Sequence, residues 1–189
     1  NIWRSSEVRN VKRPESPEEI LIWMDETIQY GWLDGEKKVH RDMTGFRRDY
    51  RIASFEECLK YRVGTCIEQV WMMHLLLDQL YLPNKMYCCR IFEPDDYGNL
   101  EEEEHMHCFV LYWKDGKVWQ IEHPNQNRKG IYAFSDEDTA VRAIEDYYIA
   151  LRGGKKSPTT EFTMVEQGLS FREFNQYINS LDGGKGRTR

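Results

Sequence analysis

Residues 107–123, HCFVLYWKDGKVWQIEH, decide the fold of this chain, because they predict a β-hairpin with a defined register. Two runs rich in aromatic and β-branched residues, 107–113 and 117–123, flank the dipeptide Asp115-Gly116. Asp-Gly between two such runs is a strong signal for a two-residue turn whose φ angles are positive. The chain therefore contains at least one antiparallel pair of strands.

The register of this hairpin predicts a histidine and a carboxylate on the same face. A two-residue turn pairs Phe109 with Glu122 and Cys108 with His123, and side chains alternate between the two faces of a sheet. His107 and Glu122 are then diagonal neighbours, about 7–8 Å apart at the backbone. A bulge or a three-residue loop would reverse the parity and favour His123 in place of Glu122. The residues expected on one face are His105, His107, Phe109, Gln120 and Glu122.

Cys66 stands at the predicted start of a buried helix. The stretch Gly64-Thr65-Cys66-Ile67-Glu68-Gln69 contains a capping box, and the following residues to about Tyr81 are apolar nearly all round. Backbone amides and the helix dipole in the first turn favour a negative charge, which lowers the pKa of a thiol. Cys66 is therefore a candidate nucleophile, and His107 with Glu122 would be its proton carrier and orienting carboxylate. Gln69 is a candidate oxyanion donor or supporting residue, with a polar contact on the helix surface as the alternative.

The other cysteines and histidines have ordinary explanations. Five cysteines without a CxxC pair leave at least one free thiol and indicate a reduced protein. We expect Cys58, Cys88, Cys89 and Cys108 to pack as small hydrophobic residues. His74 lies on an apolar helix, so we expect it to be a hydrogen-bonded core residue. His40 lies in a polar loop without a visible partner.

The remaining elements indicate an α+β fold. Helix-capping patterns predict helices at 17–30 (ended by Gly31), 55–62, 136–152 and 171–181, and strands are expected at 86–92 and 162–165. Helices, then an antiparallel sheet, then helices again are typical of α+β proteins. We expect a single domain over residues 1–182 and a disordered tail at 183–189.

Composition restricts the partners. The formal net charge of −6 argues against nucleic-acid binding, and 40% hydrophobic with 31% charged residues indicates a globular protein rather than a disordered one. No apolar run is long enough for a membrane span, so we expect no membrane association and a cytoplasmic protein. Because the chain begins with Asn1 rather than Met, we expect it to have been trimmed, and the sequence leaves open whether a targeting segment was removed. The sequence leaves the oligomeric state open.

Two ligand alternatives involve other residues. The acidic segment 93–104 predicts a solvated charge run, with attraction of a cationic substrate or calcium as the alternative. His105 and His107 with Cys66 or Cys108 would be a zinc set, but no loop presents paired ligands at zinc-finger spacing. We therefore predict no metal and no cofactor.

These motifs together resemble the transglutaminase-like superfamily of papain-like thiol enzymes. The resemblance covers residues 54–148 and rests on Gly64 to Gln69 entering a long helix, His107-Cys108-Phe109-Val110 on a strand, and Trp119-Gln120-Ile121-Glu122. It is greatest to small bacterial members in which Glu, in a W-x-x-E-H context, replaces the usual Asp. The resemblance implies a papain-like core, with the nucleophile helix packed on an antiparallel sheet and helices flanking it. It also implies a triad of Cys66, His107 and Glu122.

Two functions follow as hypotheses. The first is a cysteine protease-like hydrolase or acyltransferase, in which Cys66 forms a thioester with a peptide, protein or small amide substrate. Water or a second amine then resolves the thioester, and the sequence does not choose between them. The second is a protein-binding module that retains the transglutaminase-like fold while its triad is idle.

Overall fold

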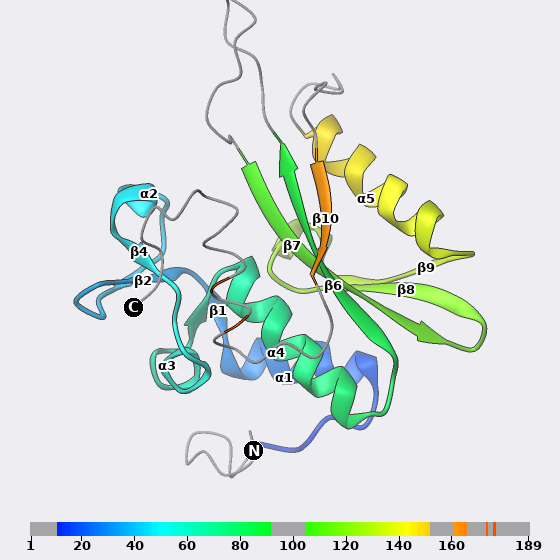
Figure 1. Cartoon of the computed structure of the whole chain (residues 1–189). Helices are drawn as coiled ribbons and strands as arrows, with labels where there is room; N and C mark the ends of the chain where they lie inside the picture. Colours follow the sequence, from blue (N-terminus) through cyan, green and yellow to red (C-terminus); the bar gives the residue numbers. More distant parts are fainter. Residues whose placement is uncertain (1–10, 92–104, 152–160, 166–172, 174–175, 177–189) are drawn as a thin grey trace, which may run out of the picture.

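The computed structural model describes residues 11–91, 105–151 and 161–165, together with Glu173 and Gln176 (Figure 1). Within these ranges the fold is α+β, with three small sheets and helices packed around them. The elements in chain order are α1 (Pro17–Thr27), β1 (Gln29–Tyr30), β2 (Trp32–Asp34), β3 (Val39–His40), α2 (Phe46–Asp49), β4 (Tyr50–Arg51), α3 (Phe55–Tyr61), β5 (Val63–Gly64), α4 (Cys66–Gln79), β6 (Asn84–Ile91), β7 (His105–Lys114), β8 (Lys117–Glu122), the 3₁₀ turn Gln126–Arg128, β9 (Gly130–Phe134), α5 (Glu137–Ala150) and β10 (Glu161–Val165).

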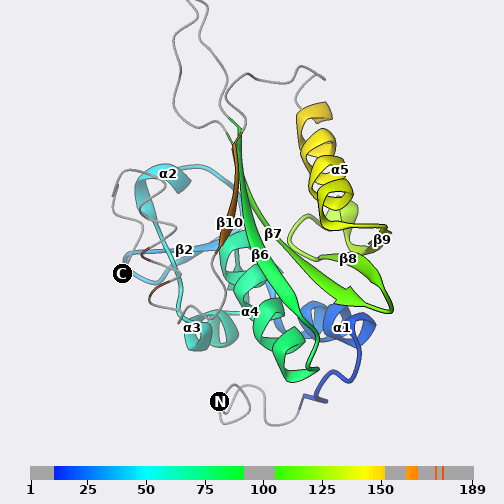
Figure 2. The same ribbon diagram turned by 45° about the vertical axis from the view of Figure 1, so that its right-hand side comes forward.

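The central sheet has the order β10-β6-β7-β8-β9, and all of its pairings are antiparallel. Helices α4 and α5 lie on opposite faces of this sheet, as the edge-on view in Figure 2 shows. Alternate residues of β7 divide between the two faces: Cys108 and Val110 belong to the core under α1 and α4, whereas Phe109 and Leu111 belong to the core under α5. Strand β7 is therefore buried on both sides along this stretch.

The predicted hairpin is confirmed. Asp115 and Gly116 form the turn with φ angles of 53° and 72°, and the register runs from Lys114 opposite Lys117 to Val110 opposite Ile121. This is the register that a two-residue turn predicts. Strand β7 continues beyond this paired stretch through Cys108 and His107.

Helix α4 begins at Cys66, as the capping pattern predicts, and ends at Gln79. It is buried on nearly all sides, with the sheet, α1 and α3 around it. The prediction for α3 is also confirmed, including the capping box of Ser54 with Glu57. Helix α5 begins one residue later than predicted, because the side chain of Asp136 rather than that of Ser135 accepts the cap hydrogen bond from Thr139 N.

The prediction that the first helix extends to Tyr30 is wrong. Helix α1 ends at Thr27, and Gln29–Tyr30 form β1, which pairs in parallel with β5. Gly31 does not end a helix but allows a close approach. A Cβ on Gly31 would lie 2.6 Å from the carbonyl oxygen of His40 and 2.8 Å from Cγ2 of Val63. Tertiary contact with β5 thus overrides the local helical pattern.

Several short elements have no counterpart in the sequence prediction, and several predictions fall outside the described ranges. Strand β9 and the small sheet β3-β2-β4 were not predicted, since their strands have only two to five residues each. Strand β10 is confirmed. The acidic segment 93–104, nearly all of the predicted helix at 171–181 and the tail 183–189 lie outside the described residues. Among the helices that the structure does describe, none combines the length and apolar character needed to cross a bilayer.

Candidate active site

The start of α4 is held in place by a buried carboxylate. Glu68 accepts hydrogen bonds from Thr65 N at 2.9 Å, from the hydroxyl of Tyr50 at 2.8 Å and from Ala53 N at 3.1 Å, and the Thr65 hydroxyl is a further partner. Thr65 Oγ1 in turn accepts from Ile67 N at 3.2 Å. The contacts join the first turn of α4 to the segment between β4 and α3. Cys66 therefore sits on a rigid helix start rather than on a loop.

His107 and Glu122 form the pair that the hairpin register predicts. Nε2 of His107 lies 2.7 Å from Oε1 of Glu122, and both side chains are almost fully buried. Glu122 Oε1 also accepts from the Tyr148 hydroxyl at 3.1 Å, and Oε2 accepts from Asn125 N at 3.3 Å. The Tyr148 ring lies 4.4 Å from the imidazole, centroid to centroid. These contacts fix the orientation of the carboxylate and of the ring.

Cys66 reaches both His107 and its neighbour Cys108. Its thiol lies close enough to both side chains for each of them to lower its pKa, and Nε2 of the imidazole is already engaged by Glu122. This contact is possible because β7 carries these two residues past its paired stretch with β8, where the start of α4 can approach them. The structure thus brings together the three residues of the expected triad.

The electrostatics of the pair favour a charged thiolate and imidazolium. The hydrogen bond from Cys108 lowers the pKa of the Cys66 thiol well below its usual value despite burial, and the hydrogen bond and charge of His107 lower it further. Burial opposes a charge on His107, but the charge of Glu122 and the hydrogen bonds to Cys66 and Glu122 outweigh it. The pKa of His107 is raised to about 10. These contacts therefore favour the thiolate–imidazolium pair over the neutral thiol and imidazole.

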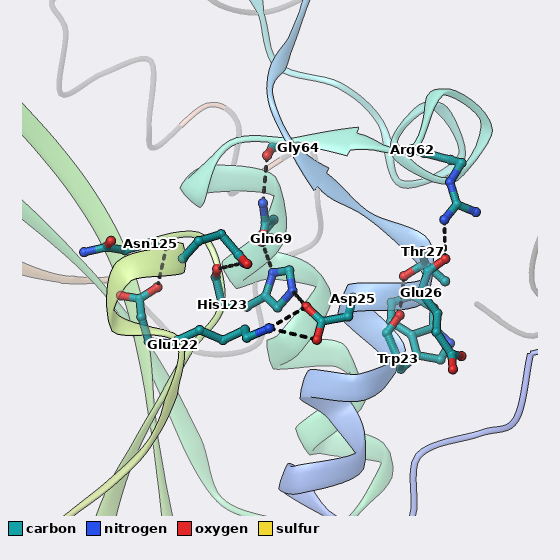
Figure 3. A network of polar contacts seen from close by, with 12 residues as sticks. Trp23, Asp25, Glu26, Thr27, Arg62, Gly64, Gln69, Glu122, His123 and Asn125 are labelled. Atoms are coloured by element: carbon teal, nitrogen blue, oxygen red, sulfur yellow. Dashed lines mark hydrogen bonds and ion pairs between the residues drawn. The ribbon is translucent and has the colours of Figure 1, made fainter. Parts of the chain in front are cut away.

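His123 belongs to a separate network behind the start of α4 (Figure 3). Its Nδ1 lies 2.6 Å from Oε1 of Gln69, and its Nε2 lies 2.8 Å from Oδ1 of Asp25 in α1. Gln69 Nε2 donates to the carbonyl oxygen of Gly64 at 2.8 Å, and Lys129 also pairs with Asp25. The contact with the imidazole of His107 is made by Glu122. The alternative in which His123 takes that place is not what the structure shows.

The alternative in which Gln69 makes a polar contact on the helix surface is wrong. The side chain is fully buried, so it makes no helix-surface contact. Its amide nitrogen and oxygen are engaged by Gly64 and His123, which are part of the scaffold under Cys66. Gln69 therefore fits the supporting role, and its role as an oxyanion donor stays a prediction.

His74 on α4 and His40 on β3 also have partners. His74 is buried and hydrogen-bonded to Asn84 at 2.6 Å, as expected for a core histidine. The prediction that His40 lacks a partner is wrong, because its Nε2 lies 2.8 Å from Asp34 and its ring stacks on Trp32 at 4.0 Å. Asp34 and His40 lie on the paired strands β2 and β3 of one small sheet. The local sequence around His40 does not indicate this pairing.

A pocket opens beside His107. It has a volume of about 300 Å³, which is at the lower end of the size range of small-molecule sites. Apart from His107, the residues that line it have no charged side chain. They are Tyr30, Pro124, Asn125, Gln126, Tyr148 and Leu151. The pocket gives an uncharged group access to the imidazole.

Sequence reasoning missed three contributors to this site: Cys108, Tyr148 and Tyr30. Cys108 directly follows His107 in the sequence, but the hairpin register does not indicate that Cys108 lies near Cys66. Tyr148 fits the apolar stripe of α5 equally well as a packing residue, and Tyr30 was assigned to a helix. Each reaches the site through contacts between distant segments.

The zinc alternative gains no partner in the described part of the chain. No group of three His, Cys, Asp or Glu side chains is arranged there to hold a metal ion.

Comparisons with protein-family models and with curated proteins find no match for this chain. The site itself therefore carries the functional argument.

Proposed function

We propose that this chain is a thiol-dependent acyl-transfer enzyme with a papain-like or transglutaminase-like fold. The observation that carries the proposal is the chain of contacts from Cys66 through His107 to Glu122 at the start of a buried helix. A nucleophile bonded to a base that is itself oriented by a third group is the signature of covalent acyl transfer. The nucleophile helix packed on an antiparallel sheet supports the proposed fold.

The proposed reaction begins with attack of the Cys66 thiolate on an amide carbonyl carbon. The first-turn amide of Cys66 has no intrahelical acceptor, so it can donate to the oxyanion that develops. His107 gives its proton to the leaving amine, and Glu122 stabilises the imidazolium before that transfer. Water or a second amine then attacks the thioester and gives its proton to His107. Release of the acyl group restores the charged pair.

The pocket beside His107 favours an uncharged substrate group next to the scissile bond. Tyrosine rings with Pro124 and Leu151 would contact an apolar or aromatic group, and the amides of Asn125 and Gln126 could pair with a peptide-like one. We therefore propose a peptide, a protein segment or a small amide as the substrate, bound with a neutral moiety in this pocket.

Site-resolved alkylation at different pH values tests the first requirement. The chain is treated with iodoacetamide between pH 5 and pH 10, and labelling of each cysteine is measured by mass spectrometry. We expect Cys66 to react near pH 6, whereas an ordinary thiol reacts only near pH 8–9. The Cys66→Ala variant should lose this labelling, and the Cys58→Ala variant, which changes a buried cysteine of α3, should retain it.

Trapping of an acyl group tests the reaction itself. An activated ester such as a nitrophenyl acetate should give a stoichiometric acyl adduct on Cys66, and amide peptides can then be screened for the same adduct. Ordinary thiol behaviour of Cys66 together with no acyl adduct would overturn the proposal. It would favour the alternative in which the fold acts as a binding module.

A further inference from the structure

Three sulfur atoms lie in series at the candidate active site. The start of α4 packs on β7, and the thiols of Cys66 and Cys108 lie close enough to shift each other's pKa. Sγ of Cys108 lies 3.2 Å from Sγ of Cys88 on the neighbouring strand. All three are free thiols. The proposed acyl transfer uses only Cys66, so the other two sulfurs need a separate explanation.

The backbone positions of Cys88 and Cys108 suit a disulfide. The two residues are directly opposite each other in the register of β6 and β7. Opposed residues of an antiparallel pair have Cα atoms about 4.5–5.5 Å apart, which is within the range found in disulfides. A bond between these sulfurs therefore requires little movement of the strands.

Exposure differs along the series. Cys88 and Cys108 are fully buried, whereas Cys66 is 7% exposed and lies beside the pocket-lining His107. Cys66 is therefore the member of the series nearest to solvent. Thiolates rather than thiols are the species that hydroperoxides oxidise, and Cys66 is the one of the three placed to be a thiolate.

We propose that Cys66, Cys108 and Cys88 form a thiol relay that moves oxidation away from the nucleophile and stores it as a Cys88–Cys108 disulfide. The co-reactant is a hydroperoxide. This inference rests on the proposed function to the extent that Cys66 is a reactive thiolate. It adds a reversible modification site that acyl transfer does not require.

Each step of the relay balances. The Cys66 thiolate attacks the peroxide, an S–O bond forms, the O–O bond breaks, and the leaving oxygen takes a proton from His107. The Cys108 sulfur then attacks Cys66, an S–S bond forms, and the hydroxyl leaves with the proton of Cys108 as water. Finally Cys88 attacks Cys108, Cys66 leaves as a thiolate, and the proton lost by Cys88 replaces the one that His107 gave up. Overall, the peroxide is reduced by two electrons and two thiols are oxidised to one disulfide.

Oxidation of Cys66 itself prepares Cys108 for its step. The hydrogen bond to Cys66 is the main reason why the pKa of Cys108 is raised well above its usual value, with the contact to Cys88 and burial adding to it. Cys108 therefore stays protonated while Cys66 is a thiolate. Conversion of Cys66 to an uncharged sulfenic acid removes that negative charge, and the pKa of Cys108 then falls.

The test is a peroxide titration of the full chain. One equivalent of hydrogen peroxide is added, free thiols are blocked with iodoacetamide, and peptides are mapped without reduction. We expect a mass loss of about 2 Da in the Cys88–Cys108 linked peptides, reversed by dithiothreitol, while Cys66 remains available for alkylation. Sulfenic acid on Cys66, seen as a gain of about 16 Da, or of about 32 Da where a second peroxide has reacted, with Cys88 and Cys108 both unlinked, would overturn the relay.

Two variants separate the steps of the relay. Cys88→Ala should stop it at a Cys66–Cys108 disulfide, so Cys66 labelling is lost until a reductant is added. Cys108→Ser keeps a hydrogen-bond donor beside Cys66 but cannot form a disulfide, so Cys66 should stop at the sulfenic acid and progress to the sulfinic acid when a second equivalent of peroxide is added. Cys58→Ala is the matched control and should behave as the unaltered chain. Equal accumulation of these oxidised forms of Cys66 in the Cys108→Ser variant and the unaltered chain would contradict the proposal.

The result also distinguishes the relay from the proposed function. If Cys66 is alkylated near pH 6 and acylated by an ester but no disulfide forms with peroxide, only the relay fails. If Cys66 reacts with neither iodoacetamide near pH 6 nor peroxide, the proposed function fails and the relay fails with it.

Discussion

At the scale of single residues, the charge on Cys66 depends on two neighbours that act in different ways. His107 supplies a positive charge and a hydrogen bond, and Cys108 supplies a hydrogen bond without charge. Glu122 acts one step further away, because it stabilises the protonated imidazole. Substitution of each neighbour should therefore change the pH profile of Cys66 in its own way.

The first prediction concerns Glu122→Gln. Loss of the carboxylate charge removes the main contribution that raises the pKa of His107, so the imidazolium is lost at lower pH than the value of about 10 in the unaltered chain. The alkaline limb of the acylation rate should move to lower pH. Cys66 alkylation at pH 6 should fall once the pKa of its thiol rises above 6, by about tenfold for each further unit. Rates are measured by stopped labelling between pH 5 and pH 11.

Glu137→Gln is the matched control for that measurement. Glu137 is also a carboxylate bonded to a tyrosine hydroxyl, that of Tyr87, but it contacts Lys85 rather than the candidate site. Its substitution should leave the profile of Cys66 unchanged. An unchanged profile in the Glu122→Gln variant would show that Glu122 does not control the charge of His107.

The second prediction compares Cys108→Ala with Cys108→Ser. Alanine removes the hydrogen bond that most lowers the pKa of Cys66, so the acid limb of Cys66 alkylation should move to higher pH. Serine restores a donor at the same position, and the limb should return toward that of the unaltered chain. Equal profiles for alanine, serine and cysteine at this position would mean that the contact has no influence on the thiolate.

At the scale of elements, the β7–β8 hairpin determines which side chains can meet. Its two-residue turn produces the register in which His107 and Glu122 share a face. A shift by one residue would send one of them to the opposite face. This part of the site was predictable, because turn chemistry and strand alternation are local properties of the sequence.

The third prediction is that Gly116→Ala destabilises the chain by about 1–2 kcal/mol. A Cβ on Gly116 would meet nothing within 4 Å, so the cost comes from its positive φ of 72° and not from a clash. Gly35→Ala is the control, since a Cβ there also meets nothing and the residue lacks a left-handed φ. Urea denaturation should therefore show a loss for Gly116→Ala and almost none for Gly35→Ala. Equal losses would contradict the assigned turn.

Helix boundaries were predictable where the residues that determine them are close together in the sequence. The starts of α3 and α4 were predicted because a capping box lies within four consecutive residues. The end of α1 was not, because pairing of Gln29 and Tyr30 with β5 decides it, and β5 lies more than 30 residues further along the chain. Short strands such as β2 and β3 likewise depend on partners that no local pattern identifies.

At the scale of the whole molecule, the start of α4 is supported from behind by α1 and the end of β8. Asp25 of α1, His123 after β8 and Gln69 of α4 form one hydrogen-bonded series that ends on the Gly64 carbonyl (Figure 3). These residues are up to 98 positions apart in the chain. Their contacts connect α1, the end of β8 and the first turns of α4.

The fourth prediction is that Gln69→Leu lowers stability without removing Cys66 reactivity. Leucine leaves His123 Nδ1 without its buried partner, which costs about 1–3 kcal/mol. The Gly64 carbonyl loses its shorter hydrogen bond but keeps the one from Gly31 N at 3.4 Å. Denaturation should show this loss, whereas folded protein should still be alkylated at Cys66 near pH 6. Loss of acylation at unchanged stability would instead support an oxyanion role for Gln69.

The sequence by itself determined the two halves of the candidate site: a thiol at the start of a buried helix, and a His–Glu pair on one face of a hairpin. Both depend on capping, turn chemistry and alternation, which act over a few residues. Only the tertiary structure decided that the halves meet, that Cys108 and Cys88 continue the series of sulfurs, and that Tyr148 and Tyr30 line a pocket beside His107. The physical reason is that these contacts depend on how α4 and α5 pack on opposite faces of the sheet, and that packing is set by the combined shape of many side chains.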